Sequence, residues 1–210
     1  MMDLLEGPSH KLQASDRKLR LFAVACCRRI WHLLGDTRSR WAVEVAERFA
    51  EGKASYEELA EADRAANAAR SAARAAARKQ GTPEAETAAH AAWCAEAVAH
   101  GSIADAASAA RAAGGPGEPA AQSRLLHCVF GPTPFQPLPA ADDAWLVWND
   151  NFVGKLAADL YEQQRFADLP LLADALEDAG CTDTSFLGHL RSVGPHVRGC
   201  WVLDCVLGKQ

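Results

Sequence analysis

The chain has 210 residues, of which 49% are hydrophobic and 23% are charged, and its net charge is −5. This composition excludes wholesale disorder, and the length suffices to bury a core without disulfides or a metal. The N-terminus lacks the basic start and apolar run of a secretory signal, and no apolar segment approaches the roughly 18 residues of a membrane span. We therefore expect a cytoplasmic protein without a membrane partner, whose seven cysteines stay reduced.

Two helices are expected at the start of the chain. The first begins directly after Ser15, whose side chain can cap a helix start. Apolar residues then recur every three or four positions from Leu19 to Leu34, the spacing of a buried helical face. A second helix is expected from Asp36 or Thr37 up to the stop at Gly52. The connection is short, so these two helices should form an antiparallel hairpin.

Two alanine-rich helical segments are expected next. Ser55-Tyr-Glu-Glu58 has the form of a capping box, and Thr82-Pro83 suits a second helix start, with a break at Gly101. Of the 60 residues from 54 to 113, 27 are alanine. Helix propensity is therefore high, but few large side chains are available for burial, so these helices either pack closely or stay partly exposed.

The run Gly114-Gly-Pro-Gly-Glu-Pro119 resists both helix and strand and predicts a linker. We therefore expect an N-terminal alanine-rich helical part (1–113), a Gly/Pro-rich linker with a short helix over 123–130 (114–140), and a C-terminal helical part (141–210). Within the last part, helices are expected over Leu169 to Ala179, about 183–191 and 195–207. No strand-like alternation competes, so the expected fold is all-α, a mainly antiparallel helical bundle with long alanine-rich helices.

Several phrases of the sequence are long enough to be specific. They are SDRKLRLFAVACCRRIW at 15–31, AWLVWN at 144–149 and GPHVRGCW at 194–201. With these phrases the chain resembles a family of uncharacterised bacterial hypothetical proteins. The resemblance implies no activity, and it supplies no catalytic residue.

Cysteine and histidine collect near the C-terminus. On a helix beginning at Pro195, His196 and Cys200 would lie one turn apart on the same face. Zinc prefers these two ligand types, and Cys181 with His189 would complete a set of four. The sequence thus predicts a zinc-type site at these four residues, with the alternative that the thiols are small buried apolar groups.

A second Cys/His pair, His90 and Cys94, has the same one-turn spacing, and His127-Cys128 could join it after the linker. A third feature, Cys26-Cys27, invites a redox interpretation. It lacks the Cys-x-x-Cys spacing of redox motifs, so helical packing of two small residues explains it better.

Asp204 is the strongest candidate for catalysis, because apolar residues flank it and a buried carboxylate needs a partner or a raised pKa. Together with Cys200 and a nearby histidine it would suit a small cysteine-dependent enzyme. The alternative is a structural ion pair with Arg198, Arg191 or an N-terminal arginine. No phosphate loop, nucleophile elbow or His-Glu-x-x-His motif is present, so a non-catalytic role is expected before an enzymatic one.

A basic stripe formed by Arg70, Arg74 and Arg78 raises the question of nucleic acid. The isoelectric point near 5.8 and the acids in the same helix argue against that partner, and a solvated helix face explains the stripe.

The leading function hypothesis is a non-catalytic protein-interaction or scaffold module, whose partner is another protein or a second copy of this chain. Trp145 and Trp148 are its candidate contact surface, with core packing as the alternative. A zinc-type metal-binding protein and a cysteine-dependent enzyme are the other two hypotheses.

Overall fold

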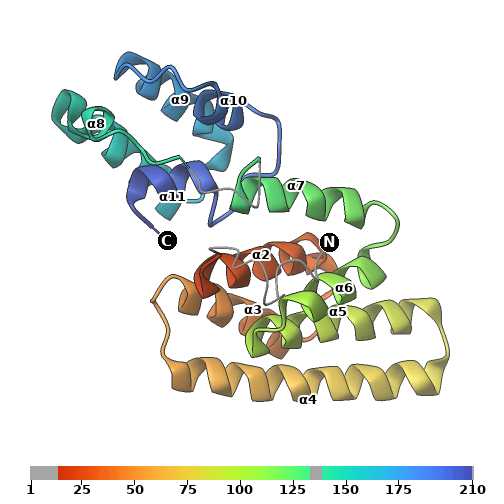
Figure 1. Cartoon of the computed structure of the whole chain (residues 1–210). Helices are drawn as coiled ribbons and strands as arrows, with labels where there is room; N and C mark the ends of the chain where they lie inside the picture. The colour runs from red at the N-terminus through yellow and green to blue at the C-terminus, as the bar shows by residue number, and fades with distance from the viewer. Residues whose placement is uncertain (1–13, 133–138, 210) are drawn as a thin grey trace, which may run out of the picture. The chain divides into compact units, whose positions relative to one another are not determined.

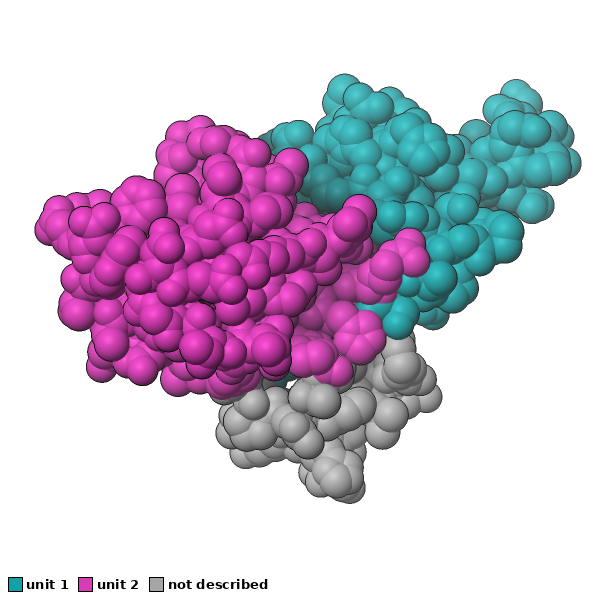
Figure 2. Space-filling model, turned by 90° about the horizontal axis from the view of Figure 1, so that it is seen from above, with its two compact units in different colours: residues 1–123 teal, residues 124–210 magenta. Residues whose placement is uncertain are grey.

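The computed structural model describes residues 14–132 and 139–209. Within these ranges it contains ten α-helices, two short 3-10 helices and no strand (Figure 1). The predicted all-α class is confirmed. No helix in the described ranges combines the length and the apolar character needed to cross a membrane. The chain divides into two compact units, residues 1–123 and 124–210, which Figure 2 colours separately.

The first unit contains five complete helices and the start of a sixth. They are α2 (Asp16–Arg29), α3 (Thr37–Ala50), α4 (Tyr56–Gln80), α5 (Pro83–His100), α6 (Ile103–Gly114) and α7 (Glu118–Phe130). Their starts confirm the predicted caps, because the side chains of Ser15, Ser55 and Thr82 each accept a hydrogen bond from a first-turn amide. Gly101, at φ +93°, ends α5 at the predicted break.

The alanine-rich helices α4 and α5 lie side by side (Figure 1). The buried face of α4 is made mainly of methyl groups, and its members are Leu59, Ala62, Ala66, Ala69 and Ala77. Most of the remaining α4 side chains are exposed or half-buried. Both sequence-based alternatives therefore apply, since one face of the helix packs and the other meets solvent.

Two arginines of α2 form hydrogen bonds with residues of α5 and α7. Arg20 donates from Nη1 to the carbonyl oxygens of Val98 and Ala99, at 2.9 and 3.2 Å, and so satisfies the C-terminal end of α5. Arg29 makes a bidentate contact with the buried carboxylate of Glu118, with Nε to Oε2 at 2.9 Å and Nη2 to Oε1 at 2.8 Å.

The predicted linker is a tight turn rather than a long connection. Helix α6 runs through Gly114 and α7 begins at Glu118, so only residues 115–117 lie between them. A Cβ atom on Gly114 would lie 2.4 Å from Cγ of Glu118, so this close approach requires glycine. The division between the units falls inside α7, after Ser123, and the short helix expected over 123–130 extends back to Glu118.

The second unit contains the end of α7 and four further helices. These are α8 (Asp143–Glu162), α9 (Leu169–Asp178), α10 (Thr184–Leu190) and α11 (Trp201–Leu207). The predictions for α9 and α10 are confirmed to within a residue or two. Fully buried side chains from all four helices form its core, among them Leu160, Tyr161, Leu172, Leu176, Phe186 and Trp201.

The helix predicted from Pro195 to Leu207 is wrong over its first half. Residues 191–200 form turns and irregular backbone, and α11 begins only at Trp201. Gly199 adopts φ +82°, a left-handed conformation that interrupts any right-handed helix running through it. His196 and Cys200 therefore do not share a helix face.

Helix α8 is interrupted near its two tryptophans. Asn149, Asp150 and Asn151 have φ values of 48°, 57° and 58°, which Asn and Asp tolerate better than other side chains. Trp145 packs edge-on against Phe186, with ring centroids 5.7 Å apart, and both Trp145 and Trp148 are partly buried against the core of the unit. Core packing, the alternative to an exposed contact surface, thus describes these tryptophans better.

Candidate metal centre

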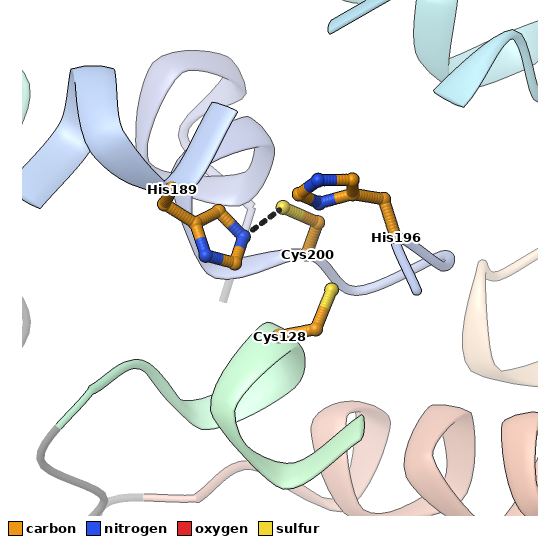
Figure 3. A group of neighbouring side chains, drawn as sticks. All are labelled: Cys128, His189, His196 and Cys200. Carbon is orange, nitrogen blue, oxygen red and sulfur yellow. Dashed lines mark hydrogen bonds between the residues drawn. The ribbon is translucent and has the colours of Figure 1, made fainter. Parts of the chain in front are cut away.

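Four side chains of the second unit converge on one point. Cys128 comes from the last turn of α7, His189 from the last turn of α10, His196 from the irregular segment 191–200, and Cys200 from the residue that caps α11 (Figure 3). One ligand atom from each residue lies within 4.8 Å of all the others. The group therefore presents two sulfur and two nitrogen donors to a common centre.

Three of these residues are the predicted His189, His196 and Cys200, and the fourth differs from the prediction. Cys181 does not belong to the group, and Cys128 stands in its place. Cys181 precedes the first turn of α10, whereas His189 lies in its last turn. The six residues from the cap of α10 to His189 span about 9 Å of helix, which separates the two side chains.

The closest contact in the group joins His189 and Cys200, whose Nε2 and Sγ atoms lie 3.2 Å apart (Figure 3). Burial by itself raises the pKa of the Cys200 thiol. Side-chain hydrogen bonds, first from Cys128 and then from His189, outweigh burial and hold that pKa well below its usual value. Cys200 is therefore set up as a thiolate, the form in which cysteine binds metals.

His196 is oriented by a contact outside the group. Its Nε2 lies 3.2 Å from the backbone oxygen of Ser192, and because a carbonyl only accepts, Nε2 must carry the proton. The lone pair then resides on Nδ1, which is buried and makes no hydrogen bond of good geometry. Metal-binding histidines commonly have this arrangement, in which one nitrogen donates to a carbonyl and the other faces the ion.

The surroundings of the group are mainly apolar. Cys128 and Cys200 are buried, at 2% and 0% exposure, and the fully buried Trp201 ring lies 5.5 Å from that of His189. Phe186 packs against the other side of Trp201, with centroids 5.0 Å apart. Only the two histidines are half-exposed. Low polarity strengthens the attraction between thiolates and a cation.

The donor set fits a zinc-type ion. Zn²⁺ takes four ligands in a tetrahedron, with Zn–S near 2.3 Å and Zn–N near 2.0 Å, which places neighbouring donors about 3.3 to 3.8 Å apart. The observed donors lie within 4.8 Å of one another, so side-chain shifts of about 1 Å would close them around an ion. Two thiolates with two imidazoles also favour zinc over magnesium or calcium, which prefer oxygen.

The other sequence-based metal pair, His90 and Cys94, is not part of the group of converging donors in the described residues. Cys94 lies in the first unit, where its Sγ donates to the carbonyl of Ala106 at 3.3 Å, while Cys128 belongs to the group described above. The neighbouring Cys27 thiol raises the pKa of Cys94 first of all, and burial adds to the effect. Burial likewise raises the pKa of Cys26. These thiols are protonated core residues, in agreement with the packing interpretation.

Asp204, the candidate for a buried charge, is 2% exposed in α11. It is not one of the four converging residues. Arg191, one of its expected partners, pairs instead with Asp174 and Glu177. The geometry therefore gives Asp204 no place in the Cys/His centre.

Comparison of this chain with protein-family models, with curated proteins and with solved structures finds no match. The resemblance to an uncharacterised bacterial family accordingly stays a prediction. The chemistry of the four converging residues is the basis on which a function is assigned.

Proposed function

We propose that this chain is a metal-binding protein whose second unit holds one zinc-type ion through Cys128, His189, His196 and Cys200. The observation that carries the proposal is the convergence of four soft donors from four separate segments within 4.8 Å. Buried thiols usually pack singly as small apolar groups. Packing of Cys200 as a small apolar group does not explain why a second thiol and two imidazoles point at the same place.

The proposed ion has a structural role. Catalytic zinc keeps one position open for water or substrate, whereas structural zinc is enclosed by four protein ligands. Here four protein donors are available and both sulfur ligands are buried. The ion would tie the last turn of α7 to the end of α10 and to the start of α11, and so hold the irregular segment 191–200.

A cysteine-dependent enzyme is the second candidate, because the 3.2 Å contact between His189 and Cys200 resembles a thiolate–imidazolium pair. The burial of Cys200 speaks against it, because its exposure is 0% and a substrate larger than a molecule such as hydrogen peroxide needs open access to the sulfur. We therefore rank metal binding first.

Alkylation distinguishes these two candidates. The full-length protein, purified without chelator and loaded with zinc, is treated with iodoacetamide and each cysteine is followed by mass spectrometry. Cys128 and Cys200 should react slowly until a chelator is added, and then much faster, because zinc occupies both sulfurs. Cys94, buried in the first unit, is the internal control and should react equally slowly under both conditions.

Rapid alkylation of Cys200 that does not change when chelator is added would contradict the metal assignment and favour the thiol enzyme.

The interaction-module hypothesis stays a prediction. Light scattering on the eluting protein and a pull-down test it, and a strict monomer that retains no partner counts against it.

A further inference from the structure

We propose that the metal centre is switched by oxidation, in which a hydroperoxide links Cys128 to Cys200 as a disulfide and the ion is released. This inference rests on the proposed function, because it assigns a regulation to the same site. It concerns only the two sulfur ligands, since imidazoles are not altered by mild peroxide.

The two sulfurs are suited to pairing because they already lie close together on separate segments. Their Sγ atoms are within 4.8 Å of each other, and Cys128 points towards Cys200 from the end of α7 (Figure 3). A disulfide requires an S–S separation of about 2 Å. Residues 191–200 are not helical, so the backbone before Cys200 can adjust as the sulfurs approach.

Another pair of adjacent thiols provides a comparison within the same chain. Cys27 on α2 and Cys94 on α5 interact through their side chains, and both are fully buried. Cys94 lies in the body of α5, whose backbone hydrogen bonds resist the adjustment that a disulfide requires, and Cys27 lies in the last turn of α2. Both residues of this pair are fully buried, whereas the metal group includes the half-exposed His189 and His196. Peroxide should therefore leave this pair reduced.

The reaction is balanced with one hydroperoxide molecule as oxidant. One ligand thiolate attacks the peroxide oxygen, the O–O bond breaks, and a sulfenic acid forms as hydroxide leaves. The second thiolate attacks the sulfenic sulfur, the S–S bond forms, and a second hydroxide leaves. Two protons from solvent convert the hydroxides to water. Two thiolates are oxidised, one peroxide is reduced, and the ion keeps only two histidine ligands.

The disulfide would replace one of the ties that the ion makes. Cys128 would remain joined to the start of α11, while His189 and His196 would be freed. Oxidation would thus loosen segment 191–200 without separating α7 from α11. A thiol reductant would reverse the change by reducing the disulfide.

The experiment uses full-length protein loaded with one equivalent of zinc and freed of excess metal. Binding is measured first, by elemental analysis. Hydrogen peroxide is then added, released zinc is followed with a chromophoric chelator, and disulfides are mapped by mass spectrometry. We expect one zinc released for each Cys128–Cys200 disulfide, and recovery of binding after reduction. Cys94→Ala is the matched control, and should release zinc at the wild-type rate.

The outcomes separate the two proposals. A protein that takes up no zinc overturns both the function and its regulation. A protein that binds zinc but retains it under peroxide, or that forms only a Cys27–Cys94 disulfide, overturns the switch and leaves the metal site standing.

Discussion

Replacing Cys128 with serine is expected to lower the zinc affinity of this protein by at least about 100-fold, because a serine hydroxyl is a poor ligand and three donors remain. The same change at Cys181 should leave the affinity unaltered, although Cys181 is an equally buried cysteine of the same unit. Competition against a chromophoric chelator measures both affinities.

This pair of variants separates the donor set seen in the structure from the one expected from sequence. Circular dichroism of each variant shows whether it is folded, so that lost binding is not mistaken for lost structure. A Cys181→Ser variant that loses zinc while Cys128→Ser retains it would show that the structure has the wrong fourth ligand.

Removing the metal should destabilise the second unit selectively. A ligand present at 100 times its dissociation constant stabilises the folded state by about 2.7 kcal/mol. In a unit of this size that corresponds to roughly 10 to 20 °C in melting temperature. Hydrogen exchange measured by mass spectrometry, with and without chelator, locates the effect. Exchange should rise in segments 124–130 and 186–205.

The helices of the first unit serve as an internal reference in the same experiment, since none of the four ligands lies there. Peptides from α3 to α5 should exchange at the same rate in both conditions. A uniform increase across the whole chain, or none in segment 186–205, would be incompatible with a local structural ion.

The helix boundaries that sequence predicts well are those marked by local chemistry. Ser15, Ser55 and Thr82 cap helices as expected, because a side-chain oxygen beside a free backbone amide is a strictly local interaction. The linker was harder to predict. Gly114 is needed for the approach of Glu118, a tertiary contact, and does not open a long flexible connection.

The candidate site is predictable only in part, because it too depends on tertiary contacts. Helical spacing predicts that His196 and Cys200, four positions apart, come together, yet a turn containing Gly199 brings them together instead. The separation of Cys128 from His189, His196 and Cys200 along the sequence gives no reason to predict that they share a site. The position of Cys128 depends on how α7 packs within the second unit, which residue patterns along the chain do not encode locally. The sequence pattern relates His127-Cys128 only to His90 and Cys94.

X-ray absorption at the metal edge of protein purified without chelator tests the metal centre most directly. The account predicts close to one zinc per chain, with two sulfur neighbours near 2.3 Å and two nitrogen neighbours near 2.0 Å. Less than a tenth of an equivalent of any transition metal after zinc loading, or a first shell of oxygen atoms without sulfur, would contradict it.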